Sequence, residues 1–148
     1  MTIPDNQDLR REDFTMGQKR ILVVDDNFFL SRTIDMCLSK KGHDVKVLST
    51  GADAVKYLFE EKPDSIVLDI KLPDCDGWFV ARLLGKLDWG KDVPLIVTSV
   101  MDPDGGKIAE IKPYAYIQKP FDMGLLMQTV ESSLSTGNPC WQMAPSTF

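Results

Sequence analysis

The sequence lacks the features that would indicate a membrane, secreted or metal-thiolate protein. No apolar run approaches the roughly 20 residues that a membrane-spanning helix needs, and the N-terminal region lacks the apolar core of a signal peptide. Cysteine is scarce and odd in number, at positions 37, 75 and 140, without the spacing of a metal site. We therefore expect a reduced, cytoplasmic protein that does not associate with a membrane.

Clustered positive charge and a glycine-rich phosphate loop are also missing. The chain carries 17 Lys and Arg against 22 Asp and Glu, for a formal net charge of -5, whereas a nucleic-acid surface needs grouped basic side chains. No glycine-rich loop follows any of the apolar runs, so a nucleotide-binding fold has little support. The charge therefore argues against direct binding of nucleic acid, and the missing loop argues against a nucleotide-binding fold.

What the sequence does contain is a regular alternation of two patterns. Short apolar runs predict strands at 21–24, 44–48, 65–68, 95–98 and 114–117. Apolar residues that step by three or four predict helices at 30–41, 52–59, 77–87, 107–111 and 125–134. Because crossovers between parallel strands are right-handed, we expect an α/β fold: a (βα)5, doubly wound, five-stranded parallel sheet with helices on both faces.

Proline and glycine crowd the segment of the predicted fourth helix. Pro103, Gly105, Gly106 and Pro113 all disfavour a helix interior, so we expect this helix to be short or irregular. The predicted organisation is a polar leader or linker at 1–18, one domain at 19–134 and an uncharged tail or linker at 135–148.

Polar side chains stand where four of the predicted strands end. Asp25 and Asp26 follow the first strand, Asp69 the third, Ser99 the fourth and Lys119 the fifth. The carboxyl ends of parallel strands meet at one edge of the sheet, where open α/β folds bind ligands. Clustered carboxylates beside an ammonium and a hydroxyl form a site for a hard divalent cation and a phosphoryl group.

Three motifs occur in one order along the chain. They are Asp25-Asp26, the segment Asp69-Ile70-Lys71-Leu72-Pro73-Asp74-Cys75-Asp76-Gly77, and Lys119-Pro120-Phe121. At this spacing, residues from about Lys19 to Leu134 resemble the receiver domain of the two-component response-regulator family. The resemblance implies a flavodoxin-like topology and a signalling switch. Such a domain is not an enzyme with a separate substrate: it transfers a phosphoryl group to its own aspartate and slowly releases it.

The resemblance also implies a role for each site residue. Asp69 would accept the phosphoryl group from a histidine kinase or a histidine phosphotransfer protein. Mg²⁺, with Mn²⁺ as a substitute, would bind Asp26 directly, Asp25 mainly through water, Asp69, and the backbone carbonyl of Lys71. Lys119 would pair with Asp69 before transfer and with a phosphoryl oxygen after it, and the peptide bond that follows this lysine is cis in the family.

Two further residues match the family's switch. The switch hydroxyl sits five positions after a proline that begins the fourth strand, here Pro94, which favours Ser99 over Thr98. The next position is usually small, and Val100 departs from that pattern in a way that could crowd the loop. Tyr116 matches the aromatic that turns inward when the hydroxyl moves to the phosphate. The resemblance therefore implies that Ser99 and Tyr116 switch the binding of a partner.

Other readings stay open at this point. A magnesium-dependent phosphatase with an aspartyl nucleophile needs a second carboxylate two residues later, where this chain has Lys71. A degenerate receiver used as a scaffold would lack part of the acidic, hydroxyl and amine set, which is complete here. Asp26 or Asn27 could serve only as a helix N-cap. A stand-alone regulator, a receiver cut from a larger or hybrid protein, and a phosphorylation-dependent dimer are all compatible with the sequence, and the downstream target is unassigned.

Overall fold

Five parallel strands form the centre of the protein, and the computed structural model describes residues 18–136 around them. The strands are β1 (Arg20–Val24), β2 (Asp44–Leu48), β3 (Ser65–Asp69), β4 (Leu95–Ser99) and β5 (Ala115–Gln118). The helices are α2 (Phe28–Lys40), α3 (Gly51–Glu60), α4 (Gly77–Lys86), α5 (Gly105–Ile111) and α6 (Met123–Thr136), with a short 3₁₀ helix, η1 (Gly90–Asp92), before β4. This order confirms the predicted (βα)5 fold.

The order of the strands places a ligand-binding edge between β1 and β3. The sheet runs β2-β1-β3-β4-β5, so the winding of the chain reverses after β2. Asp69 pairs with Thr98, and Ser99 pairs with Gln118, so the carboxyl ends of neighbouring strands lie side by side. A reversal of this kind is where open α/β sheets bind ligands.

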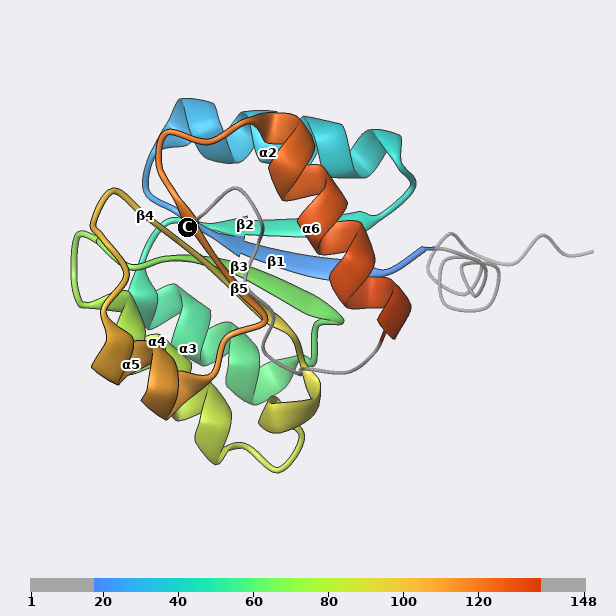
Figure 1. Ribbon diagram of the computed structural model, residues 1–148. Helices are drawn as coiled ribbons and strands as arrows, with labels where there is room; N and C mark the ends of the chain where they lie inside the picture. The colour runs from blue at the N-terminus through green and yellow to red at the C-terminus, as the bar shows by residue number, and fades with distance from the viewer. Residues whose placement is uncertain (1–17, 137–148) are drawn as a thin grey trace, which may run out of the picture.

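Helices cover both faces of the sheet. Figure 1 shows α2 and α6 on one face and α3, α4 and α5 on the other. Side chains alternate along β1, so Ile21 and Val23 pack into the core beneath α2 and α6, whereas Leu22 and Val24 pack into the core beneath α3 and α4. Full burial of such a side chain contributes about 1.5–3 kcal/mol. The inner strands therefore hold the polar edge of the sheet in place.

Four helices begin with a polar side chain that accepts a backbone N–H from the first turn. The capping residues are Asn27 for α2, Thr50 for α3, Asp76 for α4 and Asp104 for α5. A cap of this type contributes about 1 kcal/mol. Because Asn27 caps α2, the neighbouring Asp26 is not used for this purpose.

The fourth helix of the fold is short, as predicted. α5 begins at Gly105 because the carboxylate of Asp104 accepts the N–H groups of both Gly106 and Lys107. It ends at Ile111, and the C-cap residue Lys112 has a φ of 55°, in the left-handed region. α5 is therefore limited to Gly105–Ile111, and Pro113, which follows the C-cap, disfavours continuation of the helix.

The termini bear on the predicted domain limits. Residues 1–17 and 137–148, which include nearly all of the predicted leader and tail, lie outside the described residues. α6 extends to Thr136, past the predicted limit at 134.

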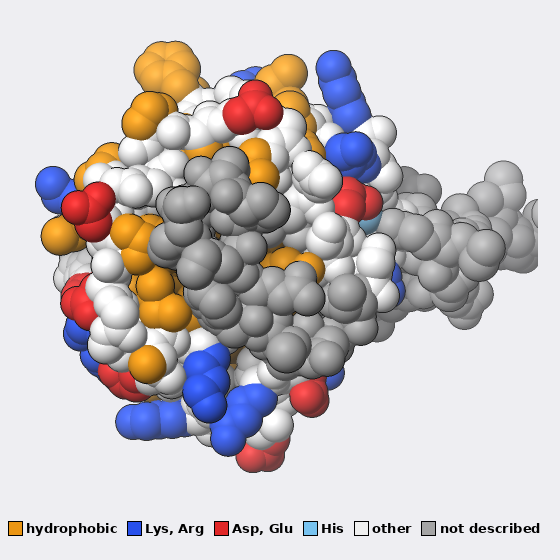
Figure 2. All heavy atoms as spheres, in the orientation of Figure 1, with side chains coloured by type: hydrophobic (Ala, Val, Ile, Leu, Met, Phe, Trp, Pro, Cys, Tyr) orange, Lys and Arg blue, Asp and Glu red, His pale blue; other side chains and the backbone are white. Residues whose placement is uncertain are grey.

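In the part of the chain that the structure describes, no helix has the length and hydrophobicity to span a membrane. Figure 2 shows hydrophobic side chains protruding over the start of α2, where Phe28 and Phe29 are 63% and 81% exposed.

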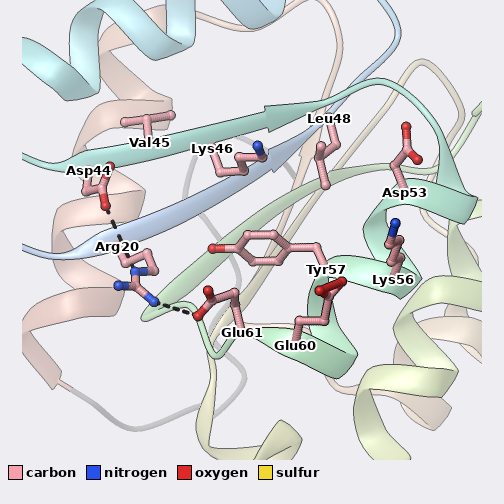
Figure 3. A pocket seen from close by; sticks show the side chains of 10 residues that line it. All are labelled: Arg20, Asp44, Val45, Lys46, Leu48, Asp53, Lys56, Tyr57, Glu60 and Glu61. Carbon is pink, nitrogen blue, oxygen red and sulfur yellow. Dashed lines mark hydrogen bonds and ion pairs between the residues drawn. The ribbon is translucent and has the colours of Figure 1, made fainter. Parts of the chain in front are cut away.

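A groove lies between the edge strand β2 and helix α3, with a volume of about 490 Å³. Tyr57 projects into it, and charged residues of both signs line it (Figure 3). Arg20 pairs with Glu61 across one end at 3.1 Å. No residue of the polar edge described above lines this groove, so we treat it as separate from the candidate site.

Candidate functional site

Three carboxylates meet at the carboxyl edge of the sheet. Asp25 and Asp26 follow β1, and Asp69 is the last residue of β3. One oxygen atom from each lies within 4.8 Å of the other two. Asp25 and Asp69 are buried, whereas Asp26 is exposed. Because like charges this close repel one another, the cluster favours a bound cation.

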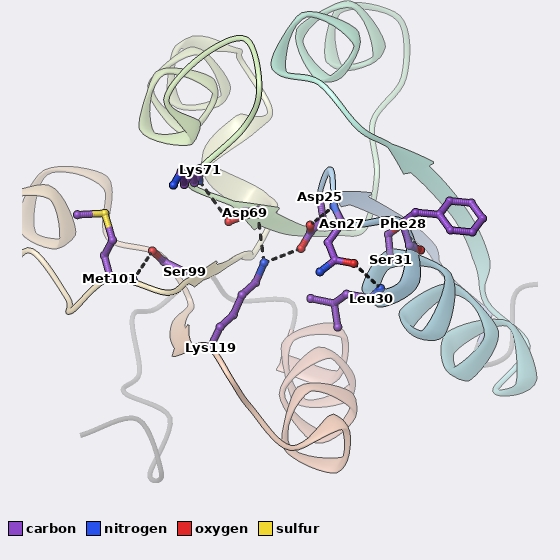
Figure 4. A network of polar contacts seen from close by, with 10 residues as sticks. All are labelled: Asp25, Asn27, Phe28, Leu30, Ser31, Asp69, Lys71, Ser99, Met101 and Lys119. Atoms are coloured by element: carbon purple, nitrogen blue, oxygen red, sulfur yellow. Dashed lines mark hydrogen bonds and ion pairs between the residues drawn. The ribbon is translucent and has the colours of Figure 1, made fainter.

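The ammonium of Lys119 reaches this cluster from the end of β5 (Figure 4). Its Nζ donates to Oδ2 of Asp25 at 2.9 Å and lies 3.3 Å from Oδ2 of Asp69. The Lys119–Pro120 peptide bond is cis, in agreement with the resemblance. The other oxygen of Asp25 accepts the N–H of Asn27 at 2.8 Å. Lys119 thus sets one positive charge against three carboxylates.

Burial and charge decide the protonation of these groups. Burial, followed by the negative charge of Asp25, raises the pKa of Asp69 above its ordinary value, and Lys119 offsets only part of that rise. Burial alone would lower the pKa of Lys119, but its interactions with Asp25 and Asp69 raise that pKa overall. Lys119 is therefore a lasting positive charge, and Asp69 keeps its proton to a higher pH than an exposed aspartate does.

The loop after Asp69 folds back toward it. Lys71 donates its backbone N–H to Oδ1 of Asp69 at 3.2 Å and forms an antiparallel bridge with Asp76. Gly77 donates its N–H to the carbonyl of Ile70 at 2.6 Å. A Cβ at Gly77 would lie 2.7 Å from the Cα of Ile70, so a larger residue would displace the backbone. This close approach keeps the main chain of Lys71 beside the carboxylates.

Ser99 and Tyr116 both contact the loop that follows β4. The Oγ of Ser99 accepts the N–H of Met101 at 3.0 Å, and its carbonyl accepts the N–H of Lys119 at 2.6 Å. The hydroxyl of Tyr116, a residue that is only 2% exposed, donates to the carbonyl of Met101 at 2.7 Å. Burial raises the pKa of the Tyr116 phenol, and the Ser99 hydroxyl lowers it in part. The two predicted switch residues therefore both bind the main chain of one residue, Met101.

Two contacts beside the site were not found by sequence reasoning. Asp74 accepts the N–H groups of Gly51 and Ala52 at 2.8 and 2.9 Å, and so provides a second cap for α3. Trp78 stacks on Tyr116, with ring centroids 6.4 Å apart and 20° between the ring planes. Each contact joins segments far apart in the chain, so no local pattern indicates it. The only available signal is the motif that begins at Asp69: Asp74 belongs to it, and Trp78 follows it directly.

The sequence and the fold both match known receiver domains. The family model of the response regulator receiver domain matches residues 21–131. The chain therefore belongs to this family, and it is a phosphoacceptor signalling module of the two-component type.

Solved structures of the same class are similar to this chain. One is the receiver domain of the sensor histidine kinase PA1611 from Pseudomonas aeruginosa PAO1, with a magnesium ion in its active-site cleft: it is 25% identical, with a TM-score of 0.71, and the match covers 80% of this chain and 98% of that one. The receiver domain of the Francisella response regulator 1452 is 27% identical, with a TM-score of 0.71 and coverages of 80% and 98%. The N-terminal domain of a three-domain response regulator from Carboxydothermus hydrogenoformans is 29% identical, with a TM-score of 0.70 and coverages of 80% and 95%.

Proposed function

We propose that Asp69 accepts a phosphoryl group from a phosphohistidine, on a histidine kinase or a histidine phosphotransfer protein, in a reaction that requires Mg²⁺. The observation that carries this proposal is the convergence of three carboxylates with the ammonium of Lys119 between Asp25 and Asp69. The carboxylates suit a metal ion, and the ammonium suits the negative charge of a phosphoryl group. Stabilisation of charge is the main contribution of a protein to phosphoryl transfer.

The transfer is a displacement at phosphorus. A carboxylate oxygen of Asp69 attacks, the P–N bond of the donor breaks, and its electron pair returns to the imidazole nitrogen, which is then protonated. Lys119 neutralises negative charge on the phosphoryl oxygens, and its two present partners place it within reach of them. The domain has no separate substrate, since the aspartyl phosphate that forms is its own and is slowly hydrolysed.

The chemistry of the donor set fits a hard divalent cation. Asp25, Asp26, Asp69 and the carbonyl of Lys71 are the protein ligands that we assign, and oxygen ligands of this kind suit Mg²⁺, with Mn²⁺ as a substitute. When bound, the metal neutralises the carboxylates and orients the incoming phosphoryl group. The magnesium ion in the related structure from Pseudomonas aeruginosa supports this assignment.

The phosphodonor protein and the downstream protein contact different parts of the surface. Phe28 and Phe29 begin α2 and are exposed, so they offer a cytoplasmic phosphodonor protein an apolar contact at the start of this helix. Phosphorylation then draws the hydroxyl of Ser99 toward the phosphoryl oxygens and, through Tyr116, changes the binding of a downstream protein or a second copy of the chain. Their contacts with the same residue, Met101, support this assignment.

Phosphotransfer from a defined donor tests the proposal. A histidine phosphotransfer protein carrying radioactive phosphate is mixed with the wild-type chain, with Asp69→Asn, and with Asp92→Asn as a control in which an exposed aspartate outside the site is changed. We expect label to pass to the wild type and to Asp92→Asn only when Mg²⁺ is present, and never to Asp69→Asn. Transfer to Asp69→Asn, or equal transfer in EDTA, would overturn the proposal.

A further inference from the structure

A buried aromatic pair joins the start of α4 to β5. Trp78 is the second residue of α4 and is 6% exposed, and Tyr116 lies in β5 and is 2% exposed. Their rings stack with centroids 6.4 Å apart. The backbone N–H of Trp78 donates to the side chain of Asp76 at 2.8 Å, so the main chain of Trp78 is anchored to the loop that follows Asp69.

The far end of the Tyr116 ring holds the loop after β4. Its hydroxyl donates to the carbonyl of Met101 at 2.7 Å, while the N–H of the same Met101 donates to Ser99 at 3.0 Å. Gln118, two residues along β5 from Tyr116, donates to the carboxylate of Asp102 at 2.9 Å. β5 thus holds this loop at two points, and one of them is braced by Trp78.

We propose that Trp78 is a positioning residue for the switch: its indole keeps Tyr116 in the buried position, so that the phenol anchors Met101 both before and after phosphorylation. This inference rests on the proposed function, and it deepens that function by assigning where the signal emerges. Tyr116, which is already buried, then acts as a fixed brace and does not make the inward turn that the family resemblance implies. The movement occurs on the Ser99 side of the held Met101 carbonyl, at Val100 and Met101, whose side chains are exposed (60% and 61%).

The packing gives the physical reason. Rotation of Tyr116 to the surface would break its stack with Trp78, remove the hydrogen bond to Met101 and leave a void in the core cluster that contains both rings. Movement of Ser99 toward a phosphoryl oxygen withdraws the acceptor from the Met101 N–H. Because Tyr116 retains the carbonyl of the same residue, the reorientation falls on the peptide unit between Val100 and Met101.

Fluorine NMR of protein labelled with meta-fluorotyrosine tests this inference. The Tyr116 resonance is assigned with Tyr116→Phe, and its exposure is measured by the solvent isotope shift, with and without Mg²⁺ and beryllofluoride as the phosphoryl mimic. In the wild type we expect no solvent isotope shift under either condition. In Trp78→Leu we expect a solvent isotope shift without the mimic. In Trp78→Phe, which keeps an aromatic ring, we expect no such shift.

Two results would overturn the inference. One is a wild-type Tyr116 resonance that is solvent-exposed without beryllofluoride and becomes protected with it. The other is a folded Trp78→Leu in which Tyr116 is as protected as in the wild type. If Trp78→Leu does not fold, the wild-type comparison and Trp78→Phe still decide the matter. The measurements without the mimic are independent of phosphorylation, so a chain that failed to take up phosphate would refute the proposed function and leave this test intact.

Discussion

The ammonium of Lys119 lies closer to Asp25 than to Asp69, at 2.9 Å against 3.3 Å. The lysine therefore occupies an oxygen of a residue that we assign to the metal site. Its charge and that of Mg²⁺ compete for the same carboxylates, although both favour phosphoryl transfer once the phosphoryl group is present.

Removal of the Lys119 charge should therefore strengthen metal binding. We expect Lys119→Met to bind Mg²⁺ more tightly, on the order of tenfold, because a competing positive charge is lost, and to be phosphorylated more slowly. Isothermal titration with Mg²⁺ measures the affinity, with Lys91→Met as the control for loss of an exposed lysine outside the site. Unchanged or weaker binding in Lys119→Met would contradict this view of the site.

The raised pKa of Asp69 predicts how stability depends on pH in metal-free protein. A carboxyl whose pKa is higher in the folded than in the unfolded chain stabilises the fold at low pH, and this contribution is lost as the pH rises through the folded pKa. In EDTA, Asp69→Asn should therefore have a higher free energy of unfolding than the wild type at neutral pH. The difference should vanish below the ordinary pKa of aspartate.

A second aspartate provides the matched contrast. Hydrogen bonds from the backbone of Gly51 and Ala52 lower the pKa of Asp74, so Asp74→Asn should lower the free energy of unfolding at neutral pH and have no effect in acid. The change should be small, because Asp74 is exposed and solvent screens it. Urea unfolding across the pH range measures both variants, and a shared sign at neutral pH would refute the assigned environments.

The close approach of Gly51 to Cys75 predicts a coupling between these two positions. A Cβ at Gly51 would overlap the Sγ of Cys75, so Gly51→Ala should destabilise the protein by about 1–3 kcal/mol. In a Cys75→Ala background the same change should be neutral or stabilising by up to about 1 kcal/mol. Urea unfolding of the four proteins completes the cycle, and an equal loss in both backgrounds would mean that the contact does not limit this site.

The exposed side chain of Lys71 predicts the lifetime of the phosphorylated protein. Its backbone lies beside Asp69, and its long stem can restrict the water that must approach phosphorus in line with the breaking bond. We expect a slowly decaying phosphoprotein and faster release of phosphate from Lys71→Ala, with Lys62→Ala as an exposed control. A rate in Lys71→Ala that is unchanged or slower than in the wild type would remove this role.

The fold and the polar edge could be predicted because both depend on short, continuous patterns in the sequence. Apolar runs mark β1, β3 and β4, and each ends in the polar residue that the sheet then brings to its edge. The first residue of α5 was missed because the side chain of Asp104 permits a start at glycine. The cap from Asp74 and the stack between Trp78 and Tyr116 depend on how α3, α4 and β5 pack together, which no local pattern specifies.

The central claim is that Asp69 is the phosphoacceptor and that the carboxylate cluster makes its reaction metal-dependent. Intact-mass spectrometry after incubation with acetyl phosphate measures it most directly, on the wild type, Asp69→Asn and Asp92→Asn, each in Mg²⁺ and in EDTA. The account predicts one added phosphoryl group on the wild type and on Asp92→Asn in Mg²⁺, and none on any protein in EDTA or on Asp69→Asn. Equal labelling of the wild type and Asp69→Asn would contradict it.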